Sequence, residues 1–411
     1  MSYSDSDLAL IEMITYINDN VLDVAGIDTK DFCIDDKRDI KTILSCFDDE
    51  AIEKLRKHKD PIDGALASGD EWASIIETLK SREDICRLEV DSYYPDSGTK
   101  LGICYTDPQN ESGPIVTYKG TTGEDEWSDN IIGMNTSDTP LQEEALAFME
   151  TLVAKGYKDI IVVGQSKGGN KAMYVTILCD EVARCVSLDG QGMSYQFMNK
   201  YEDKIKANSD KIINISLEDD YVHILLLQMM GIETAYVKGY GLQSFIENHS
   251  PNSFFVTDAD GNIILDDDGK PIFEYVQEDN PNMEIISGFV EYIMDNASAD
   301  EMQRIVSYLA PIVGEYLGNK DTDAAMELLK EDPDTLAMIV GLLFAYMKEE
   351  DISVMEMWAL FDDIGFSTED KIKIVAGLEI LQQLITDTVL YVTAYRDYKT
   401  EAKEIVEELG Y

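Results

Sequence analysis

The chain has 411 residues, of which 81 are acidic and 33 are basic, so its formal net charge is −48. A field of that sign repels nucleic-acid phosphates and anionic membrane surfaces, which excludes nucleic acid as an expected partner. Hydrophobic residues make up 45% and charged residues 28% of the chain, a composition typical of globular rather than disordered proteins.

Cysteine spacing and apolar runs indicate the compartment. The six cysteines form no Cys-x-x-Cys pair, so neither a zinc site nor a dense disulfide framework is expected. The stretch Met1–Asp7 lacks the basic region and apolar run of a signal peptide. The longest apolar run, Leu336–Met347, is too short to cross a bilayer. We therefore expect a cytoplasmic protein with no integral membrane segment.

Short helices are expected at the start of the chain, over residues 1–86. Leu8, Ile11 and Ile14 recur near helical spacing there, and no chemical motif accompanies them. From residue 87 onward the pattern changes to stretches that alternate apolar and polar residues or are rich in β-branched residues. These predict strands at 87–93, 101–105 and 115–118.

Helices and buried strands alternate after residue 138. Thr139 and Gln142 form a capping-box pattern, with Pro140 at the first helical position. Gly156 is placed to end that helix. Buried strands are expected at 159–163, 185–188, 212–216 and 236–237, with helices at 139–156 and 170–183. This alternation predicts an α/β fold with a doubly wound, mostly parallel sheet.

The segment Val256–Phe273 carries two turn signals, Asp260-Gly261 and Asp268-Gly269, which predict one β-hairpin or two. Its aspartates do not match a calcium loop. Counted from Asp258, the sixth and twelfth positions hold Ile263 and Gly269, where the loop needs Gly and Glu.

A polar linker over 277–282 precedes a helical C-terminal part. Helical periodicity is expected at 285–294, 302–317, 336–347 and 372–395. The charges of this part show no converging acid–base set. We expect a helical module that packs on the core or on a partner and contributes no catalytic residue.

Ser166 is the candidate nucleophile. It lies in Gly164-Gln165-Ser166-Lys167-Gly168, between a buried-type strand and a helix, which is the context of a nucleophile elbow. The flanking glycines are required because larger side chains would collide there. The following helix N-terminus favours developing negative charge. A serine hydroxyl is a weak nucleophile until a base takes its proton, so a histidine and a carboxylate are expected nearby.

Three histidines are available as the base. His249 fits best, because it lies in a loop after the last core strand and completes the chain order Ser, Asp, His. His58 precedes the elbow. His223 lies in the apolar run Tyr221–Leu227, which predicts the start of a helix and therefore a core or interface histidine.

Three aspartates compete as the acid that orients the base. Asp219 follows the strand 212–216, where an orienting carboxylate belongs, and is preferred. Asp220 is the adjacent alternative. Asp189 follows the preceding strand, and a turn-forming role before Gly190 is the favoured interpretation there.

The oxyanion hole needs two backbone N–H groups aimed at one oxygen. Lys167, directly after the nucleophile, supplies the first. The second is expected from the loop after an earlier strand, and Thr121 in Tyr118–Gly123 is the candidate.

These stretches resemble two groups of lipases. Tyr118-Lys119-Gly120-Thr121, followed by Glu126-Trp127-Ser128-Asp129-Asn130, resembles the Phe-Arg-Gly-Thr … Asp-Trp-x-x-Asp pattern of class three, fungal-type lipases. The elbow Gly164–Asn170 is similar, residue for residue, to the Gly-x-Ser-Lys-Gly-Gly-Asn form of a bacterial group of lipase-like α/β-hydrolases. The stretches Leu188–Gly190 and His249–Pro251 also resemble that group.

The resemblance covers about residues 115 to 255 and leaves the C-terminal helices unexplained. It implies an α/β-hydrolase fold. It also implies a triad and two oxyanion donors, namely Ser166, Asp219 and His249 with Thr121 and Lys167. Lys119 departs from the pattern, because Lys keeps the charge of Arg but loses its bidentate fork.

The sequence therefore predicts three parts: 1–86, the N-terminal helical part of the hydrolase unit; 87–276, the α/β-hydrolase core with a β-hairpin extension; and 281–411, the C-terminal helical module. The expected activity is cleavage of a carboxylic ester, from a small molecule or a lipid, through an acyl-enzyme. No metal or cofactor is implied. The alternatives are an acyltransferase, or a non-catalytic lipase-like scaffold. In the scaffold, the C-terminal helices would bind a protein partner or mediate self-association.

Overall fold

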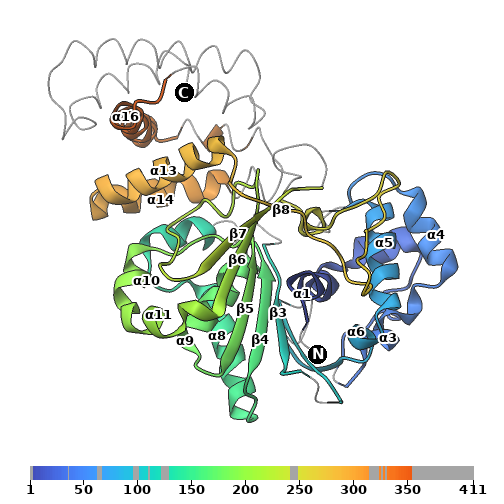
Figure 1. Cartoon of the computed structure of the whole chain (residues 1–411). Helices are drawn as coiled ribbons and strands as arrows, with labels where there is room; N and C mark the ends of the chain where they lie inside the picture. The colour runs from blue at the N-terminus through green and yellow to red at the C-terminus, as the bar shows by residue number, and fades with distance from the viewer. Residues whose placement is uncertain are drawn as a thin grey trace, which may run out of the picture.

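The computed structural model describes residues 3–353, apart from residue 36 and the segments 63–66, 96–100, 110–111, 122–128, 241–248, 314–323, 325–326 and 329–330. Within these ranges, one mixed eight-stranded sheet crosses the molecule, with helices on both of its faces (Figure 1). The strands lie side by side in chain order: β1 Glu89–Tyr94, β2 Gly102–Thr106, β3 Ile115–Tyr118, β4 Ile160–Gln165, β5 Val182–Leu188, β6 Ile212–Leu217, β7 Glu233–Val237 and β8 Tyr275–Val276. Pairing is parallel from β3 to β7 and antiparallel at both edges, which confirms the predicted α/β class and the mostly parallel sheet.

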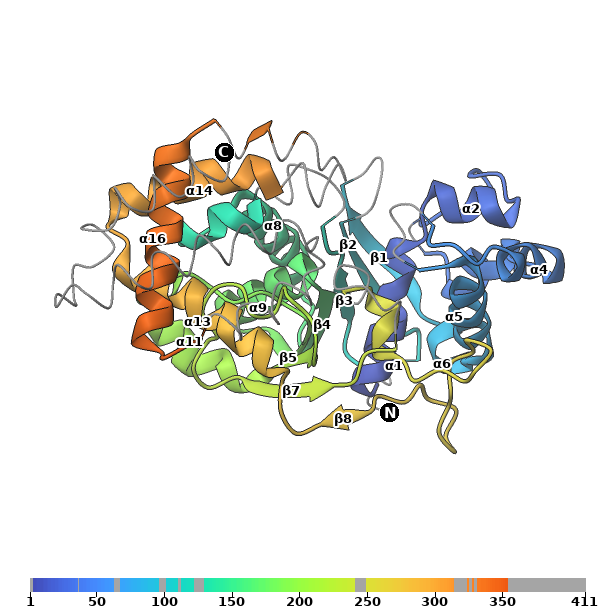
Figure 2. The same ribbon diagram turned by 90° about the horizontal axis from the view of Figure 1, so that it is seen from above.

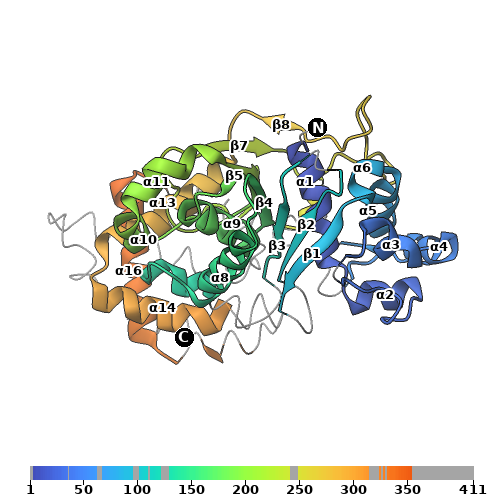
Figure 3. The same ribbon diagram turned by 90° about the horizontal axis from the view of Figure 1, so that it is seen from below.

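The crossover helices cover one face of the sheet. They are α8 Pro140–Ala154, α9 Lys167–Leu178, α10 Tyr195–Lys200 and α11 Glu202–Asn208. Successive parallel strands are added here in one direction across the sheet. Because their crossover connections all have the same handedness, the connecting helices lie on the same face. Met149, Val162 and Met173 belong to the core on this side, with α8 and α9 packed side by side (Figure 3).

The N-terminal helices cover the opposite face. They are α1 Asp5–Glu12, η1 Met13–Tyr16, α2 Asp19–Ala25, α3 Ile40–Ile43, α4 Asp49–Lys57, α5 Gly69–Ser81 and α6 Glu83–Cys86. Helix α1 lies against β4 on the side away from α9 (Figure 2). Leu8 and Ile11 share one buried cluster with Val163 and Val186, so the first 86 residues complete the core of the sheet.

The segment after His249 forms two tight turns beside the sheet edge. Gly261 and Gly269 take φ values of 80° and 76°, the left-handed region that favours glycine. Isolated bridges Thr257–Ile263 and Leu265–Pro271 close the two turns. This agrees with the predicted pair of hairpins, although neither bridge extends into a full strand.

Three described C-terminal helices pack together beyond the carboxyl edge of the sheet: α13 Pro281–Asn296, α14 Ala299–Val313 and α16 Pro333–Glu349. Ile305 and Leu342 form a cluster that also includes Ile131 and Leu226. Three of the four predicted helices are thus confirmed, and the fourth, over 372–395, lies outside the described residues. Among the described helices, none is long and apolar enough to cross a membrane.

One predicted helix end and one predicted helix are wrong. Helix α9 ends at Leu178 and not at residue 183, because Val182 already pairs with Ile160 in the sheet. The run Tyr221–Leu227 forms turns and bends and not a helix. The helices α10 and α11 were not predicted.

Candidate active site

Ser166 occupies a strained turn between β4 and α9. Its backbone angles are φ 59° and ψ −126°, in a region that non-glycine residues rarely adopt and that persists where the surrounding structure enforces it. A Cβ on Gly164 would lie 2.4 Å from the backbone of Gly168, and one on Gly168 would lie 2.0 Å from the carbonyl oxygen of Tyr118. Only glycine fits at both positions. The local geometry is therefore that of a nucleophile elbow, with the serine at the N-cap of α9.

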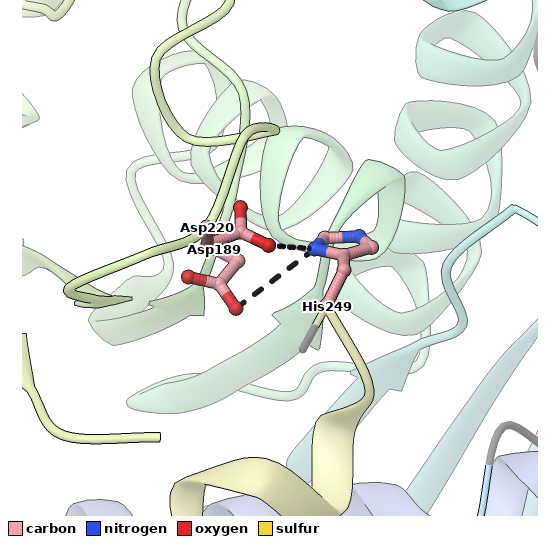
Figure 4. A group of neighbouring side chains, drawn as sticks. All are labelled: Asp189, Asp220 and His249. Carbon is pink, nitrogen blue, oxygen red and sulfur yellow. Dashed lines mark hydrogen bonds and ion pairs between the residues drawn. The ribbon is translucent and has the colours of Figure 1, made fainter. Parts of the chain in front are cut away.

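His249 lies at the carboxyl ends of the parallel strands, just before the short helix η5 Pro251–Phe254. Its ring is buried, and its Nδ1 lies 2.5 Å from Oδ2 of Asp220 (Figure 4). When Nδ1–H donates to that carboxylate, Nε2 carries the lone pair. Nε2 lies 3.3 Å from Nε2 of Gln165, whose amide also donates to the His249 carbonyl oxygen over 2.9 Å. The basic nitrogen therefore faces the end of β4, where Ser166 follows Gln165.

The aspartate that contacts His249 is Asp220, and not Asp219, which the sequence prediction prefers. Asp219 is exposed, and its Oδ1 accepts a hydrogen bond of 2.5 Å from the side chain of Asn280. Strand β6 ends in a turn in which the Asp220 N–H donates to the carbonyl oxygen of Leu217. That turn directs the two neighbouring aspartates to opposite sides. The sequence prediction was thus one residue too early, and its stated alternative has the required position.

The Asp220 side chain is fully buried and held as a carboxylate. Its Oδ1 accepts hydrogen bonds from the backbone N–H groups of Val222 and His223, over 2.7 and 3.2 Å. Burial acts to raise the pKa of this carboxyl, but the rings of His249 and His223 outweigh burial and hold the pKa well below its usual range. A charged acceptor therefore faces Nδ1 of His249 at neutral pH.

Asp189 lies beside the Asp220–His249 pair. It follows β5 with a φ of 47°, and its Oδ1 accepts a hydrogen bond of 2.8 Å from the Leu217 N–H. Its Oδ2 lies 3.9 Å from Nδ1 of His249. Burial and the negative charge of Asp220 raise the pKa of Asp189 well above its usual range. The predicted turn-former is therefore also a close neighbour of the histidine.

Asp189, Asp220 and His249 have donor atoms within 4.8 Å of one another, so a metal ion is the competing interpretation of the cluster. Metal ligands must be deprotonated, and each must direct a lone pair at the ion. Here Nδ1 of His249 is already hydrogen-bonded to Asp220, and Oδ1 of Asp189 already accepts from the Leu217 N–H. The arrangement favours acid–base chemistry over metal binding.

The two candidate oxyanion donors lie on different segments of the chain. Thr121 follows β3, and its Oγ1 accepts a hydrogen bond of 3.2 Å from the side chain of Asn130. Lys167 begins α9, and its buried ammonium lies 2.6 Å from Oδ2 of Asp129. This ion pair joins the elbow to the stretch that carries the lipase resemblance. Residues 122–128 of that stretch, with Trp127, lie outside the described residues.

Tyr16, for which the sequence predicted no role in the site, connects these segments. The hydroxyl of Tyr16 donates to Oε1 of Gln165 over 2.8 Å and accepts from the N–H of Gly120 over 3.0 Å. Lys119 is buried, with its Nζ 5.3 Å from the centre of the Tyr16 ring. The N-terminal helices therefore support both the loop after β3 and the residue that contacts His249. Tyr16 ends the short helix Met13–Tyr16, which carries no motif that marks this role.

The fold is of the α/β class. A family model described as Mbeg1-like, a lipase-like family, matches residues 107–268 of the 411. The matched stretch contains Thr121, Ser166, Asp220 and His249. The finer resemblance to class three lipases stays a prediction. No curated protein matches the chain.

Proposed function

We propose that the chain is a serine hydrolase that cleaves a carboxylic ester, with lipid esters within its substrate class. The observation that carries the proposal is the 2.5 Å hydrogen bond between His249 and Asp220, formed beside the strained turn of Ser166. An imidazole with a carboxylate on Nδ1 and its other nitrogen directed toward the end of β4 is the arrangement of a general base. The lipase-like family match supports the same reaction class.

In the proposed reaction, Ser166 Oγ attacks the ester carbonyl carbon while Nε2 of His249 takes its proton. Asp220 holds the ring and stabilises the imidazolium without taking the proton itself. The backbone N–H groups of Thr121 and Lys167 donate to the tetrahedral oxygen, in a site where such donors are worth more than in water. His249 then protonates the leaving alcohol, and a water molecule releases the acid from the acyl-enzyme by the same steps.

The test is turnover of p-nitrophenyl esters of graded acyl length by the purified protein, beside Ser166→Ala. The proposal expects turnover with a preferred chain length and its loss in the variant. Release of acyl products to an added alcohol in preference to water would identify an acyltransferase. Turnover that survives Ser166→Ala, or a folded protein that acts on no ester, would contradict the proposal.

A further inference from the structure

A second histidine contacts the proposed triad acid from the side opposite His249. His223 is 4% exposed, and its Nδ1 lies 3.5 Å from Oδ1 of Asp220. Its other nitrogen, Nε2, lies 2.8 Å from Oδ2 of Asp279. The four side chains form a continuous buried row, Asp279–His223–Asp220–His249, in which carboxylates and imidazoles alternate.

Asp279 belongs to the linker between β8 and α13, so the row ends on the segment that leads into the C-terminal helices. The next residue, Asn280, fixes that linker to the turn after β6. Its N–H donates to the carbonyl oxygen of Glu218 over 2.9 Å, and its side chain donates to Asp219 over 2.5 Å. Met283 of α13 shares a buried cluster with Val222, next to His223. The turn that carries Asp220 is therefore held by the start of the C-terminal module.

The charge of His223 is fixed by its neighbours. Burial acts to lower the pKa of His223, but Asp220 and Asp279 outweigh burial and raise that pKa to about 10. Asp189 and the Tyr236 ring, at a centroid distance of 6.0 Å, also face His223. At neutral pH an imidazolium therefore lies beside Asp220, with Asp279 on its other side.

We propose that His223 and Asp279 are positioning residues of the Asp220–His249 pair, and that the linker residues Asp279 and Asn280 couple the C-terminal helices to it. The inference rests on the proposed function and adds to the site two residues, His223 and Asp279, that support Asp220. The ion pair of His223 with Asp279 carries no net charge, so its effect on the potential at His249 is smaller than that of either charge alone. Loss of either partner changes that potential, with opposite signs.

The test is the pH dependence of the rate at which a fluorophosphonate labels the full-length protein, compared among three variants. His223→Gln leaves Asp279 as an unpaired negative charge. This favours the protonated, inactive form of the base, so the acid limb of the profile moves up by about one pH unit. Asp279→Asn leaves the positive charge of His223 balanced by Asp220 alone, so the acid limb moves down by a similar amount. The double variant restores neutrality, and its acid limb returns toward that of the wild type.

Opposite shifts that cancel in the double variant are an electrostatic result that a folding defect would not produce. His58→Gln is the matched control, since His58 lies in the N-terminal helices at the end of α4, and it should leave the profile unchanged. Shifts of the same sign in both single variants, or no shift in either, would overturn the coupling.

Nitrogen NMR of the imidazoles gives a readout that needs no activity, because the chain holds three histidines. His223 should remain protonated through neutral pH in the wild type and lose its proton at lower pH in Asp279→Asn. A wild type that is never labelled but shows this titration would contradict the proposed function and leave the His223–Asp279 pair intact. A labelled wild type in which His223 is neutral at pH 7 would overturn this inference alone.

Discussion

Nδ1 of His249 lies 2.5 Å from Oδ2 of Asp220, although the two residues are 29 positions apart and lie on separate loops. The contact exists because β6 and the segment before η5 both end at the carboxyl edge of the parallel sheet, where α/β proteins bind ligands. It brings Asp220, and not Asp219, to His249 and directs Nε2 of the ring toward the end of β4. The predictions below follow from this relationship and from the groups that support it.

Asp220→Asn should lower ester turnover by about 10⁴-fold, because an amide at this position favours the wrong tautomer of His249. Asp219→Asn is the matched control one residue away. Its side chain is exposed, and an amide oxygen can still accept from Asn280, so most of the rate should remain. Steady-state turnover at pH 8 distinguishes them, and the reverse ranking would restore Asp219 as the acid.

Tyr16→Phe should lower kcat by roughly tenfold and leave KM little changed, since a loss of about 1.4 kcal/mol in the transition state corresponds to one decade in rate. The hydroxyl contacts Gln165 and the N–H of Gly120, and neither contact requires bound substrate. Tyr201→Phe, which removes a hydroxyl bonded to Asp138 away from the site, serves as control. Equal losses in both variants would indicate a stability effect only.

Glu12→Gln should stabilise the protein at high pH and have little effect at low pH. Burial raises the pKa of Glu12 to about 8, although the backbone N–H of Gln165 and the charge of Lys119 both act to lower it. The folded state therefore binds this proton more tightly than the unfolded chain. Its contribution to stability is fully present below about pH 4.5 and is lost as the pH rises through 8.

Urea unfolding at pH 5 and pH 9 measures this effect. The gain from Glu12→Gln should grow by at most a few kcal/mol between the two values, at about 1.4 kcal/mol for each unit of pKa shift. Glu53→Gln, at an exposed position on α4, should show no such dependence. A gain that is equal at both pH values would mean that Glu12 is ionised throughout.

Asp129→Asn and Lys167→Met should each destabilise the fold, by about 3–5 kcal/mol where a buried charge is left without its partner. The two groups lie 2.6 Å apart, with side chains 6% and 0% exposed. The double variant removes both charges and should recover much of the loss. Chemical denaturation of all four proteins measures the coupling, and strictly additive losses would show that the ion pair is not a stabilising unit.

Much of the sheet could be predicted because its central strands are runs of β-branched residues. The run Ile160–Val163, for example, is buried on both faces and is followed by glycine. The helices α10 and α11 were missed because each spans barely two turns and carries few buried positions, such as Phe197 and Ile205. Short helices depend on tertiary packing more than on their own pattern.

The turn at Ser166 could be predicted in full. It requires glycine at two positions, and Gly164 and Gly168 each lie two residues from Ser166 in the sequence. The aspartate that contacts His249 lies one residue after the preferred candidate, because the direction of a side chain after β6 depends on the turn and not on residue type. The contact of His223 with Asp279 spans 56 positions and joins two segments with no shared motif. Only the folded arrangement brings them together.

The measurement that tests the central claim most directly is the mapping of a fluorophosphonate adduct by peptide mass spectrometry. The wild-type protein should carry one adduct, on Ser166, at the turn that β4 and α9 hold in place. The adduct should be absent in Ser166→Ala and should form far more slowly in His249→Ala. An adduct on another residue, or labelling that persists in Ser166→Ala, would contradict the assignment of Ser166 as the nucleophile.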